Sequence, residues 1–250
     1  MVAFYLPGEV PVYAFSLLLG AAASLGLFWV AWQSEPQLAR QRVVAGLGTL
    51  LGGLLGGRAA YIGVNWAYFQ NHPAEIIQLP LGGLAWPGAV AGGILALPIV
   101  ALIGRQSLPG LADALLPLIA VLTIAVWLAC WMDGCAYGQP TGAWYSVPAR
   151  DEWGNLTGRW PLQFTGALIT FALVQGIDHA RNRGWLQIPG RAACVGVFGL
   201  SLQWWLLSLL RADPAPQWNG QRLDTWAAIG FAILAALALL VMLIRPQLCD

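Results

Sequence analysis

The segment from Ala129 to Trp144 brings together the side chains best suited to chemistry, at the end of the apolar run 114–132. Within six residues it holds an acid, a thiol, a phenol and two glycines: Asp133, Gly134, Cys135, Tyr137 and Gly138. Glycine permits turns and close backbone approach that other residues resist. We therefore expect a functional site here, where an apolar helix gives way to a loop.

Arg58 is a second candidate, because it stands inside an apolar stretch that reads G-G-L-L-G-G-R-A-A-Y. A charge at membrane depth costs a few kcal/mol unless it is paired or hydrated. One interpretation is that Arg58 snorkels to the interface. The other, which we favour, is a guanidinium held for a lipid phosphate, which its planar fork suits. The preceding glycines are expected to pack helices closely: Gly52, Gly53, Gly56 and Gly57.

The composition defines the class of protein. Of 250 residues, 58% are hydrophobic and 9% are charged, and the mean hydropathy is +0.66. Soluble domains carry about a quarter charged residues, so this is an integral membrane protein. The net charge of +1 gives no reason to expect a nucleic-acid partner. The chain has no lysine, which excludes lysine-based catalysis, and its four cysteines and two histidines lack the spacing of a metal site. We expect neither a metal nor a cofactor.

Mostly uncharged runs of about 20 residues, the length that crosses a bilayer, predict an all-α polytopic membrane protein with about seven transmembrane helices. The runs are Pro11–Trp32, Val43–Phe69, Leu84–Gly104, Ala114–Met132, Trp160–Ile177, Ala192–Leu210 and Thr225–Ile244. They form one transmembrane domain over residues 1–250. With the N-terminus outside and the C-terminus cytoplasmic, seven arginines fall inside and five outside, as the positive-inside rule requires. The longest loop, at about 133–160, is then an outer loop.

Two further features lead to local predictions. Leu81–Gly93 is dense in glycine around Pro87, which predicts a broken or re-entrant element. Asp113, at the cytoplasmic start of the fourth run, is expected to cap its own helix or to lie in its first turn. His72 and His179 have no partner nearby in the sequence and are expected at the surface.

Several short stretches, in order along the chain, resemble motifs of one membrane enzyme family. They are Pro11-Val12-Tyr13 with Gly20, Gly57-Arg58-Ala59-Ala60-Tyr61, Gly82-Gly83-Leu84-Ala85-Trp86, Gly134-Cys135-Ala136-Tyr137-Gly138, Pro161 with Gln163, and Gly220-Gln221-Arg222-Leu223. Together they resemble the prolipoprotein diacylglyceryl transferases over nearly the whole chain.

The resemblance implies transfer of the diacylglyceryl group from phosphatidylglycerol, or a related phospholipid, to the thiol of a lipobox cysteine in a prolipoprotein. It also implies a multi-pass place in the bacterial inner membrane. Such chemistry needs a cation for the phosphate and a means of favouring the thiolate. The catalytic residues it implies are Tyr13, Tyr61, Tyr137 and Asp133. The substrate-binding residues are Arg58, Gly83, Gly88, Gly134, Cys135, Gly138 and Gln163, with Arg150 and Arg159 as further phosphate contacts.

The chain departs from the family pattern at several polar positions. Pro87 replaces the histidine of the family's His-Gly-Gly motif, and Trp160 replaces a histidine that precedes Pro161. In the family's signature, Trp127 replaces the arginine, Cys130 the asparagine and Cys135 the acid. Trp204 replaces an arginine later in the chain. These changes leave two alternatives open. One is a non-catalytic relative that binds a lipid or partner, and the other is a head-group transferase that uses Cys135 as nucleophile or acceptor.

Overall fold

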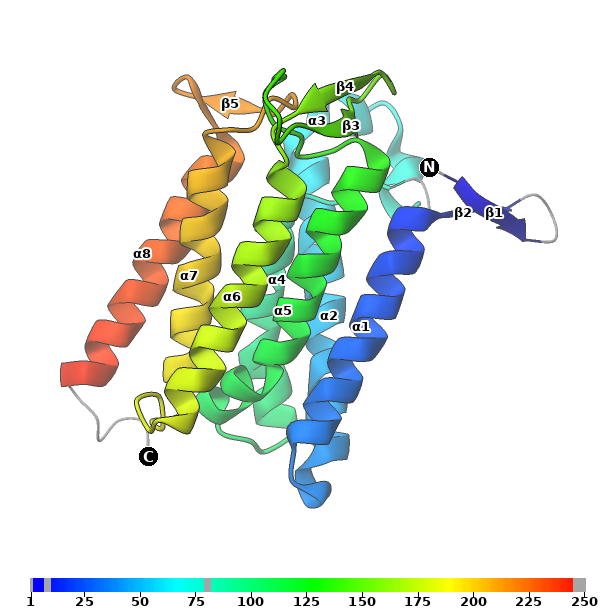
Figure 1. Ribbon diagram of the computed structural model, residues 1–250. Coiled ribbons are helices and arrows are strands. Elements are labelled where there is room, and N and C mark those ends of the chain that lie inside the picture. Colours follow the sequence, from blue (N-terminus) through cyan, green and yellow to red (C-terminus); the bar gives the residue numbers. More distant parts are fainter. Residues whose placement is uncertain (1, 7–9, 79–81, 245–250) are drawn as a thin grey trace.

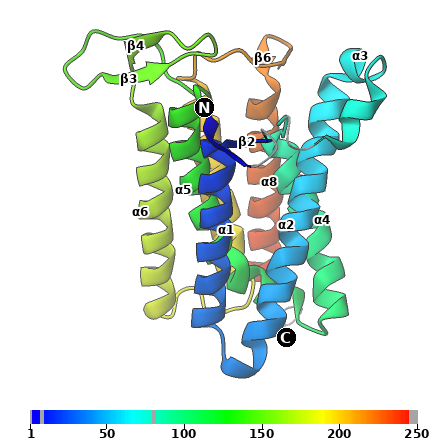
Figure 2. The same ribbon diagram turned by 90° about the vertical axis from the view of Figure 1, so that its right-hand side faces the viewer.

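The computed structural model describes residues 2–6, 10–78 and 82–244, which form an upright helical bundle with short hairpins at one end (Figure 1, Figure 2). Seven long helices make up the described bundle: α1 (Ala14–Gln33), α2 (Pro36–Val64), α4 (Trp86–Ile103), α5 (Leu108–Asp133), α6 (Leu162–Asn182), α7 (Arg191–Ser208) and α8 (Leu223–Ile244). A short helix α3 (Trp66–Phe69) and a 3-10 turn η1 (Pro73–Ile77) follow α2.

Five of the described helices, α1, α2, α4, α5 and α8, are long and apolar enough to cross a membrane. Helices α6 and α7 are long enough but more polar, since α6 ends in a run with Asp178 and Arg181 and α7 carries Gln203. Large apolar side chains such as Leu95, Leu102 and Leu168 are exposed on the outside of the bundle. An apolar surface of this kind suits a lipid environment. The structure therefore agrees with an all-α membrane protein.

Three two-stranded antiparallel hairpins, which the sequence did not predict, accompany the helices. They pair β1 (Val2–Leu6) with β2 (Val10–Tyr13), β3 (Val147–Arg150) with β4 (Leu156–Arg159), and β5 (Gln217–Trp218) with β6 (Gln221–Arg222). The last has a recognisable signal, because Asn219 and Gly220 both have positive φ, as a type I′ turn requires. The second hairpin lies in the long loop predicted at about 133–160.

Helices α2 and α4 approach so closely that glycine is required between them. A Cβ built on Gly92 would lie 2.2 Å from the Gly52 carbonyl oxygen, and one on Gly88 would lie 2.3 Å from that of Gly56. No side chain fits at such a distance. The predicted close-packing role of the glycines before Arg58 is therefore confirmed at Gly52 and Gly56.

The prediction of a re-entrant element at 81–93 is wrong for the part that the structure describes, since Leu81 lies outside it. Helix α4 runs without a break from Trp86 to Ile103. Pro87 occupies its first turn, where a missing N–H costs nothing because no helical acceptor is available there. The glycines contribute to the close contact with α2 instead of breaking the helix.

Asp113 caps a helix, but not its own. Helix α5 begins at Leu108, so Asp113 lies beyond its first turn. Its carboxylate accepts hydrogen bonds from the backbone N–H groups of Gly190, at 2.8 Å, and Ala193, at 2.7 Å. These groups start α7, which would otherwise leave its N–H groups unpaired. The acid therefore ties α7 to α5 at the end of the bundle opposite the second hairpin (Figure 1).

Three tryptophans stack through the middle of the bundle. The ring of Trp204 on α7 lies 4.8 Å from that of Trp86 on α4 and 4.5 Å from that of Trp127 on α5. Trp127 is fully buried, and α6 accommodates it at Gly166, where a Cβ would come within 2.4 Å of the indole. The stack joins four helices just below the hairpin end.

Candidate functional site

The site predicted at the end of α5 is built around a left-handed residue. Helix α5 ends at Asp133, which is exposed, and Gly134 follows with a φ of +76°. This is a common helix ending, since glycine adopts that conformation without strain. A Cβ on Gly134 would lie 2.7 Å from the Asp151 carbonyl oxygen, so the second hairpin packs directly on this turn.

Cys130 and Cys135 form a disulfide across the same turn. The reversal at Gly134 brings their Cα atoms to 4.6 Å, within the range that a disulfide needs. The sequence left the redox state of this pair open. The expectation that Cys135 could serve as a thiol nucleophile or acceptor is wrong for this structure, because its sulfur is already bonded. Cys249 lies outside the described residues.

We expect the disulfide to be detectable chemically and to stabilise the loop. In the chain-entropy account, closing so short a loop contributes about 2 kcal/mol. Alkylation after reduction should add two more labels than alkylation alone, as mass spectrometry would show. The double variant Cys130→Ser/Cys135→Ser should show no such difference and should unfold at a lower temperature. An equal label count before and after reduction in the parent protein would contradict the pairing.

Tyr137 is the most buried polar group of the predicted loop. Its hydroxyl donates a hydrogen bond to the Glu152 carboxylate, and the Arg159 guanidinium carbon lies 4.3 Å from its ring centre. Burial, followed by the bond to Glu152, raises the pKa of Tyr137 to about 12. The phenol therefore keeps its proton near neutral pH and acts as a hydrogen-bond donor rather than as a base.

The raised pKa of Tyr137 predicts a loss of stability at high pH. The folded state holds the proton up to about pH 12, whereas an unfolded tyrosine loses it near pH 10. The contribution is therefore complete below pH 10 and declines as the pH rises toward 12. Denaturation of the purified protein between pH 9 and 12 would measure it. Tyr137→Phe should flatten this dependence and Tyr145→Phe, in the same loop, should not.

Other contacts hold the loop against the neighbouring helices. Gln163, at the start of α6, is buried and donates to the Cys135 carbonyl at 3.0 Å. Gly138 packs on Trp160, since a Cβ there would lie 2.6 Å from the Trp160 Cβ. The N–H of Ala212 donates to the Tyr137 carbonyl at 2.9 Å. The loop is thus fixed from both the α6 and the α7–α8 sides.

Arg159 is buried, with 7% of its surface exposed, yet its guanidinium is poorly satisfied. Its two polar contacts within the described chain, the Gly138 carbonyl and the Asp151 carboxylate, are both 3.5 Å long. Its Nε has no hydrogen-bond partner among the described residues. A buried guanidinium with unfilled donors, beside the Tyr137 ring, is suited to receive an anion.

Arg211 is engaged in a charge network that the sequence did not reveal. It bonds the Asp213 carboxylate through two nitrogens and that of Asp224 through the third, at 2.6–2.9 Å. Arg222 bonds the same two acids. Burial acts to raise the pKa of Asp213, but the bonds from Arg211 outweigh it and hold that pKa below its ordinary value. The charges of the two arginines and the two carboxylates cancel. The network therefore stabilises this end of the bundle but leaves no unpaired cation to bind a substrate anion.

Arg58 holds a loop in place, and it lies together with two other predicted site residues, Tyr61 and Gly83. Its guanidinium donates to the carbonyls of Glu75, Ile76, Gly82 and Gly83. It lies 5.9 Å from the Tyr61 ring centre, and a Cβ on Gly83 would come within 2.5 Å of that ring. The side chain is 7% exposed, so it is buried instead of snorkelling. Most of its donors are occupied by the loop.

Two of the predicted residues lie apart from these clusters. Gly88 faces Gly56 and Ala60 inside the α2–α4 contact, where it serves packing. Tyr13 precedes α1 at the hairpin end and is half-buried. Within the described residues it makes no hydrogen bond or ring contact with the other candidates.

Glu152, the acceptor for Tyr137, was missed by sequence reasoning. It stands in the run D-E-W-G-N, which is typical of an exposed turn, and its side chain is indeed exposed. Only the hairpin formed by β3 and β4 brings it back to Tyr137. Asp224, in the first turn of α8, was missed for a similar reason, since it meets Arg211 only when α7 and α8 lie side by side. Asp213 was also missed, although it lies only two residues beyond Arg211 in the sequence.

An apolar bundle that carries a cluster of arginine, tyrosine and acid at one end defines an integral membrane protein with a polar site at the end of its helices. Residues 1–242 match the family model described as prolipoprotein diacylglyceryl transferase. The chain belongs to this family.

Three relatives are phosphatidylglycerol–prolipoprotein diacylglyceryl transferases. The protein of Thermosynechococcus vestitus is 30% identical over 142 residues, which are 54% of this chain and 51% of the relative. A second, of Clostridium perfringens, is 26% identical over 66% of this chain and 65% of its own length. That of Corynebacterium diphtheriae is 24% identical over 94% and 90%. The chain thus spans about half to two thirds of the first two and most of the third.

Proposed function

We propose that this protein transfers the diacylglyceryl group from phosphatidylglycerol to the thiol of a lipobox cysteine in a prolipoprotein. In that reaction the sulfur forms a bond to the glyceryl carbon, and the bond from that carbon to the phosphate oxygen breaks. Glycerol phosphate leaves, and the thiol proton passes to an acceptor. Membership of the family over residues 1–242 supports the reaction.

The unfilled guanidinium of Arg159 is the observation that carries the placement of the donor phosphate. The leaving group is an anion, and a charge-assisted bond to a planar guanidinium stabilises it as the bond breaks. Of the buried arginines at the hairpin end, Arg58 is occupied by four carbonyls and Arg211 by two carboxylates. Arg159 has only contacts of 3.5 Å.

The tryptophan stack supports the same placement. Trp127 and Trp204 stand where the resemblance implies arginine, and their stacked rings fill the centre of the bundle. These two positions therefore offer no guanidinium for a phosphate, only neutral indole rings. The donor phosphate is accordingly assigned to the hairpin end, with Arg58 as a secondary contact through the one guanidinium hydrogen not bonded to a carbonyl.

The remaining predicted residues take roles that follow from their protonation and position. Tyr137, which keeps its proton, donates a hydrogen bond, and the exposed carboxylate of its partner Glu152 accepts the proton of the acceptor thiol. Asp133 lies at the same end of α5. Tyr13 and Tyr61 are assigned to lining the approach of the substrates. Gly134, Gly138 and Gln163 shape the loop, and Cys135 does so through its disulfide.

We also propose that all seven long helices cross the bacterial inner membrane, with the N-terminus and hairpins outside. The disulfide supports this orientation, because such bonds persist on the oxidising side of the membrane. Three arginines at the facing ends of α6 and α7 and between them, Arg181, Arg183 and Arg191, support a cytoplasmic position for the opposite end.

Complementation tests the proposed function. The chain is expressed in cells depleted of their own diacylglyceryl transferase, and the modification of lipoproteins is followed by mass spectrometry. We expect thioether-linked diacylglyceryl on the lipobox cysteine. If the protein is inserted and folded but no modification appears, the transferase proposal is overturned and a non-catalytic relative becomes the better description.

A further inference from the structure

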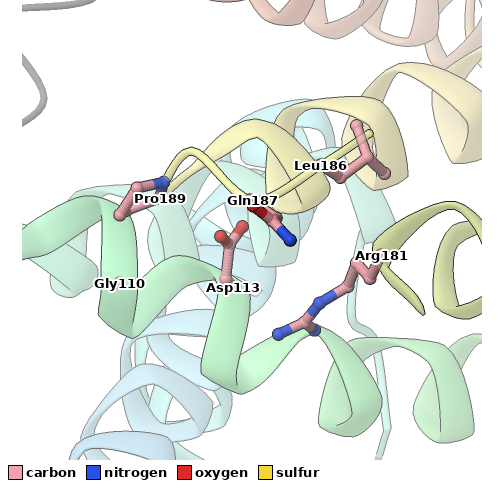
Figure 3. Close-up of a pocket in the computed structure, with 6 residues that line it drawn as sticks. All are labelled: Gly110, Asp113, Arg181, Leu186, Gln187 and Pro189. Carbon is pink, nitrogen blue, oxygen red and sulfur yellow. The ribbon is translucent and has the colours of Figure 1, made fainter. Parts of the chain in front are cut away.

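A pocket of about 310 Å³ lies at the end of the bundle away from the tryptophan stack and second hairpin, between the start of α5 and the α6–α7 connection. Figure 3 shows the side chains of Asp113, Arg181 and Gln187 gathered around it. A smaller cavity of about 70 Å³ shares Asp113 and Arg181 with it and extends to the α1–α2 turn, where Ser34 and Arg42 line it. The two cavities share Gly110, Asp113 and Arg181 in their linings, and the smaller one is lined by both Arg181 and Arg42.

Both arginines have unused hydrogen-bond donors. Among the described residues no side-chain hydrogen bond or salt bridge is formed by the Arg181 guanidinium, which attracts the Asp113 carboxylate of the same pocket electrostatically. Arg42 donates one bond, to the Ser34 hydroxyl at 3.2 Å. Its Nε is buried and has no partner among the described residues. A buried donor such as the Arg42 Nε is costly to leave unpaired, and the half-buried Arg181 guanidinium faces the pocket.

Asp113, the acid among the lining residues, offsets only part of this positive charge. Both oxygens of Asp113 are taken by the N–H groups of Gly190 and Ala193, so its charge already serves the start of α7. Two cations and one satisfied carboxylate leave a net positive pocket. Gln33 and Gln187 add side-chain amides to the lining.

We propose that this pocket binds a phosphate group, supplied by an anionic phospholipid of the adjoining leaflet. Two guanidinium forks match phosphate oxygens, and basic pockets between membrane helices bind phospholipid head groups. The opening at the end of the helices gives access from the membrane surface. The site is separate from the Arg159 cluster, because it adjoins the beginning of α5 whereas that cluster adjoins its end.

Lipid binding to the purified full-length protein tests the proposal. Native mass spectrometry would follow retention of phosphatidylglycerol, with zwitterionic phosphatidylcholine as the comparison. We expect Arg181→Gln to weaken phosphatidylglycerol binding about ten-fold, the effect of losing a charge-assisted bond, and Arg42→Gln, on another helix, to act in the same direction. Arg183→Gln is the matched control, since Arg183 is exposed and lies near Trp185 instead of the pocket.

The source of the phosphate is decided in parallel. Inorganic phosphate and glycerol phosphate are tested for their ability to raise the unfolding temperature of the parent protein and of Arg181→Gln. Stabilisation by these ions that depends on Arg181 would assign the pocket to a soluble phosphate, and retention of the lipid alone would assign it to the head group. Unchanged lipid and ion binding in both Arg181→Gln and Arg42→Gln, or an equal loss in Arg183→Gln, would overturn the proposal. Lipoprotein modification is not a readout here, so this test stands apart from the transferase assay.

Discussion

Replacing Arg159 by Gln is expected to lower lipoprotein modification by about 100-fold, while the amount of folded protein in the membrane stays unchanged. Removing one donor that stabilises a developing anion costs 10²–10³ in rate in other enzymes. The fold should tolerate the change, since the polar contacts of Arg159 within the described chain are both 3.5 Å long. Quantitative mass spectrometry of a lipoprotein in the complementation strain would give the rate.

The sequence suggested Arg150 as a phosphate contact beside Arg159, but in the hairpin its side chain is exposed whereas that of Arg159 is buried, so Arg150 provides the control. Arg150→Gln removes the same charge and should leave modification close to the parent level. Arg159→Lys keeps the charge but loses the planar fork, and an intermediate rate is expected. Full activity in Arg159→Gln would move the phosphate contact elsewhere, and Arg58 would be the next residue to test.

Gly92→Ala is expected to destabilise the protein by about 1–3 kcal/mol or to prevent its accumulation. The new methyl group would lie 2.2 Å from the Gly52 carbonyl oxygen. This oxygen belongs to the main chain of α2, so it cannot move aside by a rotamer change as a side-chain atom could. Helices α2 and α4 would have to separate along their whole contact. Thermal unfolding of the purified protein in detergent would measure the change.

The neighbouring residue supplies the comparison. A Cβ on Gly93 would meet its nearest atom, a methyl carbon of Thr49, at 3.7 Å, which is an ordinary contact. Gly93→Ala should therefore be neutral or slightly stabilising, since alanine favours a helix over glycine by about 1 kcal/mol. Equal effects of the two substitutions would show that α2 and α4 are not packed as described here.

The helices could be predicted from hydropathy, but their ends could not. The run predicted at Ala192–Leu210 became α7 at Arg191–Ser208, a close match. The run at Val43–Phe69 became α2 at Pro36–Val64, which starts seven residues earlier. Arg40 and Arg42 end the apolar run without ending the helix. The charged residues mark the end of the apolar surroundings, but the helix itself begins further toward the N-terminus, at Pro36, and proline suits the first turn of a helix.

The candidate site was predicted in part, and the missing part consists of long-range partners. Gly134 and Tyr137 were expected and do lie together, because they belong to one turn, and Gln163 joins them from the start of α6 through its bond to the Cys135 carbonyl. Asp113 was expected to cap its own helix or to lie in its first turn. Its carboxylate oxygens instead accept hydrogen bonds from backbone N–H groups 77 and 80 residues further along the chain. The hydrogen bond from Tyr137 to Glu152 depends on the hairpin of β3 and β4, which the pattern of apolar residues did not predict. Such pairs depend on how elements pack, which single-residue patterns do not encode.

The disulfide at the end of α5 also determines an order of events in the life of the protein. In the proposed orientation, with the hairpin end outside, Cys130 and Cys135 would emerge from insertion as thiols and would pair only after this end has left the reducing cytoplasm. The turn at Gly134 is then locked by an oxidant of the cell envelope, not by folding alone. Cells whose envelope oxidation is impaired would therefore carry inserted copies of this chain without the disulfide, and the proposed lipid transfer to prolipoproteins would become sensitive to the redox state outside the cell.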